Sequence, residues 1–446
     1  MENWLTRLKG LRRYPSLAAG VLVIILFIGV SVYTVIAIPY SEGIRLWRGG
    51  PGVWDENPKN ARPIWFDLFT RDRLARTIIV TSEDTGITRV EPLTDDINLV
   101  EIVLPFKYNY DGFPRELILF TTVTFEASHM PVTVFWRTPD ERSITLQEDR
   151  LVRRGPASYY ISQDIELIAQ LGDRLPHDAL FADPEDEDRP LRGDYEIVVQ
   201  AELREGDELS AKLMVAGQVH GVAGTDHRRR DLMVALLWGA PIGLAFGVLA
   251  AVGAQLSTFV LAGIGTWFGG KTERIFQWVT QVNIILPMLP ILIMIGYFYS
   301  RSIWVMLGLV IALNVFSASM FTYRAMFLQA KETPYFEAAQ AYGAGNFRII
   351  FRYLLPRIAP TLLPQFVLIV PTFVFLEATL AVLGLGDPRL PTWGKVMNDA
   401  YRAGALYKGY YYWIAQPAAL LMMMGVGFAL VGFALDRIFN PRLRTV

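Results

Sequence analysis

The chain has 446 residues, of which 52% are hydrophobic and 19% charged, and its mean hydropathy is +0.30. Soluble proteins average about 25% charged residues, so this composition predicts that part of the chain lies in a membrane, and it excludes a disordered chain. Its formal net charge of −1 argues against a nucleic-acid binder, which needs a concentrated basic face. The absence of cysteine excludes disulfides, thiolate catalysis and Cys-based metal sites, and the four histidines disfavour a histidine metal cluster.

Charge is distributed unevenly along the chain. Residues 40–222 carry 20 Lys and Arg against 33 Asp and Glu, which leaves 22 against 10 for the rest. A near-neutral total therefore hides an acidic segment and a basic, apolar remainder.

Six apolar runs are long enough to cross a bilayer, which takes about 17 to 25 residues. The first, Leu17–Pro39, follows four basic residues and is longer than the apolar stretch of a cleaved signal peptide, so we expect an uncleaved anchor. Leu232–Phe268 exceeds one perpendicular span, which predicts a steep tilt or an interfacial beginning. The later runs are Leu232–Phe268, Phe276–Tyr299, Ile303–Tyr323, Thr361–Leu385 and Tyr412–Leu435.

The distribution of basic residues predicts the topology, because Lys and Arg favour the cytoplasmic side of short loops. With the N-terminus inside, the cytoplasmic pieces carry 14 Lys and Arg, and the two short outer loops carry five. Both termini are then cytoplasmic, and residues 40–222 lie outside the cell. Arg228, Arg229 and Arg230 run against this pattern, since they fall on the outer side just before Leu232.

The acidic segment divides the chain into three parts. Residues 1–39 form the N-terminus and first span, 40–222 an extracytoplasmic β-rich, sandwich-like domain, and 223–446 an all-α domain with five further spans. Asp183–Arg189 has the look of a calcium loop but lacks its Gly and spaced ligands, so a solvated acidic turn is the favoured interpretation. The β-type segments, which alternate or are rich in Val, Ile, Thr and aromatic residues, include Leu99–Pro105, Glu116–Glu126, Pro131–Trp136, Tyr195–Leu203 and Leu209–Gly217.

The segment 331–358, between the fourth and fifth spans, predicts two short helices. Thr333 is a good N-cap and Pro334 a good first helical residue. Glu337 lies near the positive end of the helix dipole, the alanines beside it leave a smooth surface, and Gly343 can end the helix in the left-handed conformation. A short, stiff helix of this kind is suited to docking into a groove on another protein.

The second helix is expected from Asn346, with Arg348 and Arg352 on a separate face from its apolar stripe. The stripe is predicted to comprise Phe347, Ile350, Phe351 and Leu354.

This segment resembles the EAA loop of ABC importer permeases. The matching positions are Glu337, Ala338, Ala339, Gly343, Leu355 and Pro356. Further stretches are similar to the second permease subunit of dipeptide, oligopeptide and nickel transporters: Gly224–Asp226 with Arg230–Asp231, Phe268–Gly270, Phe375–Gly386, Pro391–Gly394 and Asn440–Arg444. The resemblance covers the first anchor and nearly everything from Gly224 onward.

The resemblance implies a multi-pass permease in a bacterial or archaeal plasma membrane. Its partners would be a second, homologous permease, two cytoplasmic ABC ATPases docked on the EAA loop, and an extracytoplasmic substrate-binding protein. ATP and magnesium would be held by the ATPases, so this chain is expected to be no enzyme and to hold no cofactor or metal. Peptides or a related small solute would be the substrate, imported from outside.

Two features depart from the family pattern. The family normally has a much shorter outer segment in place of residues 40–222, so the role of this insert, as a landing platform for the binding protein or a stabiliser of the permease pair, stays open. Arg229 stands where the pattern has Gly, which leaves the turn before Leu232 in doubt.

Gly265–Thr272 matches the phosphate-binding pattern G-x-x-x-x-G-K-[ST], which requires a preceding strand and a flexible, glycine-rich loop. Here it ends an apolar run and contains two bulky aromatic residues. We therefore interpret Lys271 as an interfacial anchor. A membrane-anchored ATPase using this segment, and a sensor whose outer domain binds ligand, are the rival hypotheses.

Polar groups inside the spans are candidates for the translocation path, because burying them in a membrane is costly. Glu377 either lines or gates the path or pairs with a polar group at the outer interface. Asn283 and Asn314 are further path candidates, although interhelical hydrogen bonding is the more common role of such amides. Kinks are predicted at three prolines: Pro287, Pro290 and Pro371.

Overall fold

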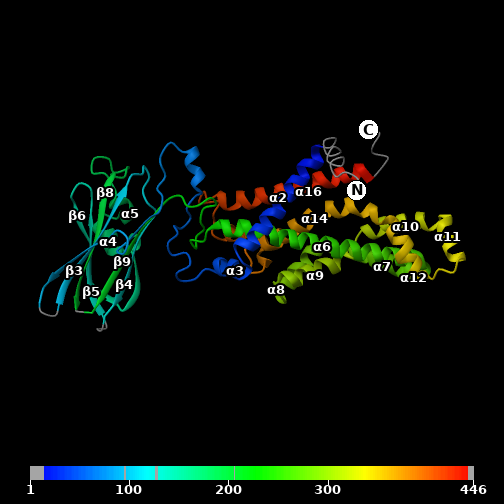
Figure 1. Ribbon diagram of the computed structural model, residues 1–446, viewed down its shortest axis with the longest axis horizontal. Coiled ribbons are helices and arrows are strands. Elements are labelled where there is room, and N and C mark those ends of the chain that lie inside the picture. Colours follow the sequence, from blue (N-terminus) through cyan, green and yellow to red (C-terminus); the bar gives the residue numbers. More distant parts are fainter. Residues whose placement is uncertain (1–14, 95–96, 126–128, 205, 440–446) are drawn as a thin grey trace, which may run out of the picture. The chain divides into compact units, whose positions relative to one another are not determined.

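The computed structural model describes residues 15–94, 97–125, 129–204 and 206–439 and comprises two compact units (Figure 1). One unit consists of Met1–Arg48 and Val234–Val446, the other of Gly49–Met233. The first is helical and the second is β-rich. The basic residues before the first span, Arg7 to Arg13, and the terminal motif Asn440–Arg444 lie outside the described residues.

The helical unit follows the apolar runs of the sequence. Its helices, with α6 beginning two residues before the unit boundary, are α2 (Pro15–Ala37), α3 (Tyr40–Arg48), α6 (Leu232–Phe268), α7 (Gly270–Ile285), α8 (Met288–Phe298), α9 (Ile303–Asn314), α10 (Ser319–Lys331), α11 (Pro334–Ala341), α12 (Asn346–Arg348), the π-helix η3 (Ile349–Leu354), α13 (Leu355–Ile358), the 3-10 turn η4 (Ala359–Thr361), α14 (Leu362–Leu380), the π-helix η5 (Ala381–Leu385), α15 (Trp393–Arg402) and α16 (Tyr412–Phe439).

Among the described residues, four continuous helical stretches are long and apolar enough to span a membrane: Pro15–Ala37, Leu232–Phe268, Asn346–Leu385 and Tyr412–Ile438. Two bent pairs raise the number to six if each pair is one span: α7 with α8, bent by 76°, and α9 with α10, bent by 49°. The helical membrane-type domain expected from the sequence is confirmed with four to six spans.

The predicted kinks have different outcomes. Pro287 is the residue before α8, so it lies at the sharper of the two breaks, as expected. Pro290 lies in the first turn of α8, where a proline costs no helical hydrogen bond. Pro371 lies inside α14, which is assigned as one uninterrupted helix from Leu362 to Leu380.

The core of the helical unit is formed by α2, α6, α14 and α16, and small residues allow close approach. A Cβ added to Gly20 on α2 would lie 2.7 Å from the Gly427 carbonyl oxygen on α16. Trp393, at the start of α15, is 2% exposed and donates its indole N–H to the Leu236 carbonyl oxygen at 2.9 Å. The helices are therefore held together by close packing of small residues and by the hydrogen bond of the buried Trp393.

The β-rich unit contains two antiparallel sheets, in the orders β1-β9-β4-β7 and β2-β3-β8-β5-β6. Its elements are the 3-10 helix η1 (Ile64–Phe69), β1 (Ile78–Thr81), β2 (Ile87–Pro92), β3 (Ile97–Tyr108), β4 (Glu116–Thr124), β5 (His129–Arg137), β6 (Ser143–Arg153), β7 (Gly155–Tyr160), the 3-10 turn η2 (Ile161–Gln163), α4 (Ile165–Gln170), α5 (Pro176–Ala179), β8 (Gly193–Arg204) and β9 (Glu208–Ala216). Each β-type segment named from the sequence coincides with a strand, so the β-rich character is confirmed.

Both sheets contribute to a single hydrophobic core. Leu119 and Leu213 come from one sheet and Ile102 and Val199 from the other, and all four are buried. Aromatic residues fill the space between the sheets, and their ring pairs are stacked, edge-to-face or tilted: Phe106, Tyr108, Trp136, Phe181 and Tyr195.

The acidic stretch Asp183–Arg189 forms an exposed turn closed by a hydrogen bond from the Asp183 amide to the Arg189 carbonyl oxygen at 3.0 Å. The Asp183 carboxylate accepts the Glu185 amide, and that of Asp186 accepts the Asp188 amide. These carboxylates stabilise the turn by accepting hydrogen bonds from its backbone amides. Within the described ranges, no three His, Asp or Glu side chains converge in a way that could hold a metal ion.

The turn before α6 explains how three arginines fit beside a span. Arg229 is buried and donates to the Glu116 carboxylate at 2.6 Å and to the Asn57 carbonyl oxygen at 2.7 Å. Arg230 is also buried and is paired with Asp226 at 2.6 Å. Two of the three positive charges are thus neutralised by carboxylates of the β-rich unit.

Candidate docking site and transport path

The segment 331–358 begins with α11, whose start follows from its sequence. Thr333 is the N-cap residue and Pro334 occupies the first turn, as predicted. The Thr333 hydroxyl, however, donates backward to the Ala330 carbonyl oxygen at 2.7 Å instead of accepting an α11 amide. It therefore closes α10, and the fixed φ of Pro334 is left to initiate α11.

Gly343 ends α11 in the left-handed conformation, with φ +78°, which confirms the prediction. Its amide donates to the Gln340 carbonyl oxygen at 2.9 Å, and the Ala344 amide donates to that of Ala339 at 3.0 Å. This pair of bonds is the Schellman motif, which satisfies the last carbonyl groups of a helix. A side chain at position 343 would have open space but would impose backbone strain.

The loop rests on the end of α6. Lys331 donates to the carbonyl oxygens of Thr266 and Trp267 at 3.0 and 2.9 Å, so its ammonium group caps that helix end. The Trp267 indole N–H donates to the Asn346 side chain at 3.1 Å, and Phe336 of α11 packs edge-on against the Trp267 ring. The loop is therefore held in place by packing and hydrogen bonds.

The apolar stripe predicted for the second helix is wrong at two of its four positions. Phe347 and Phe351 are 67% and 50% exposed, whereas Ile350 and Leu354 are buried as expected. The cause is the π-helix η3, whose wider turn shifts the inward face. Pro356 lacks the amide that would continue the α-helical bonds, and the bulge lies directly before it. The buried set is Ile349, Ile350, Leu354, Leu355 and Ile358.

The residues left on the outside form an exposed surface of small, aromatic and basic side chains. Glu337 and Ala338 of α11 are exposed, Ala339 is half-buried, and Tyr342 is 92% exposed. Arg348 and Arg352 are exposed beside Phe347 and Phe351. Leu355 is buried and Pro356 is exposed. Some of the six motif positions therefore lie on the exposed surface, and others pack beneath it. Rigid aromatic and arginine side chains of this kind favour binding another protein.

Gly265–Thr272 has the conformation of a helix junction. Gly265, Trp267 and Phe268 are the last residues of α6, and α7 begins at Gly270. The Gly269 amide already donates to the Gly265 carbonyl oxygen at 2.9 Å. The segment is preceded by a helix, whereas a phosphate-binding loop needs a preceding strand. It therefore matches the pattern in sequence but not in structure.

Asn283 and Asn314 come together where the two bent pairs break. They line a cavity of about 220 Å³ with the ends of α7 and α9. The Asn283 amide donates to the carbonyl oxygens of Leu313 and Phe316 at 2.7 and 3.1 Å, so it bridges the two pairs. The Asn314 amide donates to the Val310 carbonyl oxygen of its own helix at 2.8 Å.

Glu377 is 8% exposed and faces the start of α15. Its carboxyl group lies within hydrogen-bonding reach of the Thr392 hydroxyl, and Thr392 also accepts the Lys395 amide as the N-cap of α15. Next to it, a Cβ on Gly394 would lie 2.5 Å from the Ala378 carbonyl oxygen. Pairing with a polar group is one of the two roles expected for Glu377, and its contact with Thr392 at the start of α15 corresponds to that role.

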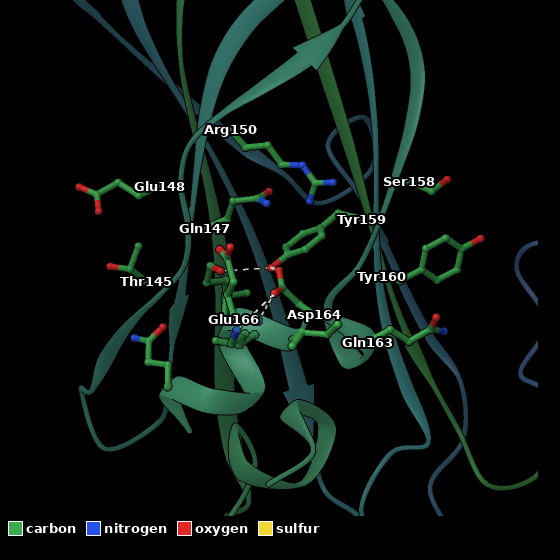
Figure 2. Close-up of a pocket in the computed structure, with 14 residues that line it drawn as sticks. Thr145, Gln147, Glu148, Arg150, Ser158, Tyr159, Tyr160, Gln163, Asp164 and Glu166 are labelled. Carbon is green, nitrogen blue, oxygen red and sulfur yellow. Dashed lines mark hydrogen bonds between the residues drawn. The ribbon is translucent and has the colours of Figure 1, made fainter. Parts of the chain in front are cut away.

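The β-rich unit contains a groove that the sequence did not indicate, because its residues come from strands that carry no motif. It has a volume of about 820 Å³ and lies between β6 and β7, the edge strands of the two sheets, above α4 (Figure 2). Figure 2 shows the Tyr159 hydroxyl meeting the Asp164 carboxylate, at 2.7 Å, below Arg150. Burial and the Asp164 carboxylate raise the pKa of Tyr159.

Residues 243–445 match the family of binding-protein-dependent transport system inner membrane components. The oligopeptide transport system permease protein OppC of Bacillus subtilis is 30% identical over 223 residues, which are 50% of this chain and 72% of the relative. This chain belongs to the ABC importer permeases.

Two further relatives extend this comparison. The dipeptide transport system permease protein DppC of Bacillus subtilis is 29% identical over 224 residues, covering 50% of this chain and 68% of the relative. The glutathione transport system permease protein GsiD of Pectobacterium atrosepticum is 25% identical over 225 residues, covering 50% and 73%. The match to the second-permease type inferred from the sequence is confirmed.

The permease family explains the turn before α6. Arg229, which replaces the Gly of the family pattern, has φ +64°, a conformation that glycine adopts without strain. The permease keeps the turn with a non-glycine residue whose guanidinium is anchored to Glu116. The family match begins at residue 243, so the β-rich unit lies outside it.

Proposed function

We propose that this permease imports peptides, as one of two homologous permease subunits driven by separate cytoplasmic ATPases. The class of substrate is supported by the relatives, which are named as oligopeptide, dipeptide and glutathione permeases. The rival hypothesis of a sensor receives no support from them, since each is a transport permease.

The exposed α11 surface carries the proposal. Glu337, Ala338 and Gly343 lie on a short helix that is anchored from beneath by Phe336 and Trp267 and is open to solvent above. A helix held this firmly can transmit a displacement to the spans, because Lys331 and Trp267 connect it directly to the end of α6. We assign the docking of an ATPase to this surface.

The arrangement within the helical unit supports the topology that we propose. Figure 1 shows α11 and α12 at one end of this unit and α3, which leads into the β-rich insert, at the other. If α11 faces the cytoplasm, where ATP is available, residues 40–222 are extracytoplasmic and both termini are cytoplasmic. The excess of Lys and Arg in the proposed inner segments supports the same orientation.

The insert can serve the delivery of substrate. Its groove between β6 and β7 presents Arg150 together with Glu148 and Glu166, so it offers both signs of charge to a polar partner. We propose that this unit receives an extracytoplasmic substrate-binding protein, and that released peptides pass the cavity lined by Asn283 and Asn314. Both assignments extend the proposed transport function.

Peptide uptake in the native host tests the proposed substrate class. Cells from which the gene is deleted should lose the uptake of labelled peptides of at least one length, and the wild-type gene should restore it. A variant with Gly343→Pro should be inserted in the membrane yet fail to restore uptake. Unchanged uptake of di-, tri- and oligopeptides in the deletion strain would contradict the assignment of peptides as the substrate.

A further inference from the structure

The 3-10 helix η1 exposes an apolar surface that the β-rich core leaves uncovered. Leu68 and Phe69 are 82% and 78% exposed, and Val222, on a neighbouring segment, is 67% exposed. Trp65 connects them, because its ring lies edge-on to Phe69 and its indole N–H donates to the Val222 carbonyl oxygen at 2.9 Å. We call Ile64, Trp65, Leu68, Phe69 and Val222 the η1 patch. Contiguous exposed apolar residues mark a surface that contacts another phase or partner.

The η1 patch is fixed to the point where span α6 begins. The Ile64 amide donates to the Gly221 carbonyl oxygen at 2.9 Å, and the Ala61 amide donates to the Thr225 hydroxyl oxygen at 2.9 Å. The Leu232 amide, at the first residue of α6, donates to the Gly224 carbonyl oxygen at 3.0 Å. One hydrogen-bonded segment therefore joins the patch to a 37-residue helix that contains no charged residue.

The chemistry around the η1 patch suits the boundary between lipid and water. The Trp65 N–H is already paired with a protein carbonyl group, so the ring can leave water without exposing an unsatisfied donor. Residues 62–76 carry four arginines against two aspartates, although the insert as a whole is acidic. Arg71 and Arg73 lie two and four residues after Phe69 and are exposed, as cations that meet lipid phosphates must be.

We propose that the η1 patch inserts into the interfacial layer of the phospholipid bilayer and anchors the β-rich unit to the membrane surface. Leu68 and Phe69 enter the layer deepest, Trp65 lies at the level of the headgroups, and the flanking arginines contact phosphate groups. A lipid surface is favoured over a protein partner because the patch combines apolar tips with a cationic flank and is tied to the beginning of a span. This anchoring is independent of how an ATPase or a binding protein docks.

The absence of cysteine from the chain permits a direct test by single-cysteine labelling. Full-length Leu68→Cys and Phe69→Cys proteins are spin-labelled in nanodiscs of phosphatidylethanolamine and phosphatidylglycerol. The accessibility of each label to oxygen, which concentrates in lipid, is compared with its accessibility to a water-soluble nickel chelate. Ile165→Cys is the matched control, because Ile165 belongs to the same unit and is 80% exposed.

We expect the ratio of oxygen to nickel accessibility to be several-fold higher at positions 68 and 69 than at position 165. A ratio equal to that of the control would place the η1 patch in water and overturn the proposal. Exclusion of both reagents would indicate a protein contact and would also overturn it. Val222→Cys, on the other segment of the patch, supplies the same measurement if either first variant fails to fold. None of these outcomes bears on peptide uptake, so the two proposals can fail independently.

Discussion

Arg229 and Glu116 form a buried ion pair, with a nitrogen of the guanidinium 2.6 Å from a carboxylate oxygen and both side chains less than a tenth exposed. Arg229 lies in the turn before span α6, and Glu116 is the first residue of β4. The pair therefore couples the turn before α6 to strand β4, and both lie outside the residues that the family match covers.

Removing Glu116 should destabilise the β-rich unit strongly. The variant Glu116→Ala leaves the Arg229 guanidinium buried without a carboxylate, which costs about 3 to 5 kcal/mol in buried pairs. For a unit of this size each kcal/mol lowers Tm by about 2 to 4 °C, so we expect a fall of the order of 10 °C in the thermal unfolding of its sheets, followed by circular dichroism.

Two comparisons sharpen this prediction. Arg229→Gly should cost less, because glycine relieves the strain at φ +64° and Glu116 keeps hydrogen-bonding to Gln163 at 3.0 Å. Glu187→Ala, which removes a 72% exposed partner of Arg174, should leave Tm almost unchanged. If Glu116→Ala and Glu187→Ala lowered Tm equally, burial of the ion pair between Arg229 and Glu116 would contribute nothing to stability.

Lowering the pH below about 6.5 should destabilise the same unit through two histidines. Burial lowers the pKa of His177 and of His220 from the ordinary 6.5. Below that pH the unfolded chain binds protons that the folded chain rejects, so stability falls with pH until the folded-state pKa values are reached. Burial raises the pKa of Asp231 from 3.8, and its contribution has the opposite sign as the pH falls.

The measurement is Tm as a function of pH for the wild type and for a His177→Gln, His220→Gln double variant. We expect the wild type to lose stability as the pH falls below about 6.5 and the double variant to show a flatter profile. Identical slopes for the two proteins would exclude the histidines as the source of the acid sensitivity.

Asn283 and Asn314 should differ in their contributions to stability. Asn283→Leu removes two hydrogen bonds that join α7 to α9 and to the turn after it, and we expect a loss of about 1 kcal/mol in thermal unfolding of the purified permease. Asn314→Leu removes a bond within one helix and a weak contact to the Met288 sulfur, so its effect should be smaller. The reverse order would contradict the bridging role of Asn283.

The proposed topology can be tested with two tyrosines that are almost fully exposed. Tyr342 in the α11 loop is 92% exposed and Tyr407 in the loop after α15 is 97% exposed. In sealed right-side-out vesicles, a membrane-impermeant maleimide should label Tyr407→Cys but not Tyr342→Cys, and inverted vesicles should give the opposite result. Labelling of both variants from one side would place the two loops together and refute the orientation.

The elements that the sequence predicts well are those defined by local chemistry. Long apolar runs mark the spans, and Pro334 and Gly343 mark the ends of α11 because each restricts or requires a particular φ. The break between α9 and α10 has no proline or glycine in residues 315–318 to announce it. The exposure of Phe347 and Phe351 depends on the π-helix, whose bonding pattern leaves no period in the sequence.

The tertiary contacts of individual side chains could not be predicted from the local sequence either. The neighbour of Glu377 is Thr392, fifteen residues further on and across a loop, and the groove in the β-rich unit forms where two edge strands of different sheets meet. The carboxylate of Glu116, 113 residues earlier in the chain, neutralises Arg229, one of the arginines that counted against the predicted topology. Such pairs depend on how distant segments fold together.

The most direct test of the account is whether an ATPase co-purifies with the permease from its native host in mild detergent. The decisive comparison is Gly343→Pro against Gly409→Pro. Both glycines have positive φ, +78° and +76°, both have open space for a Cβ, and each amide donates to the carbonyl oxygen three residues earlier. The two substitutions therefore introduce the same local defect in different loops.

We predict that the wild type and Gly409→Pro retain the ATPase, and that Gly343→Pro loses it while remaining inserted and folded. Failure of any ATPase to co-purify with the wild type, under conditions that preserve known transport complexes, would contradict the account. Retention of the ATPase by Gly343→Pro would contradict the assignment of the α11 loop as the docking surface.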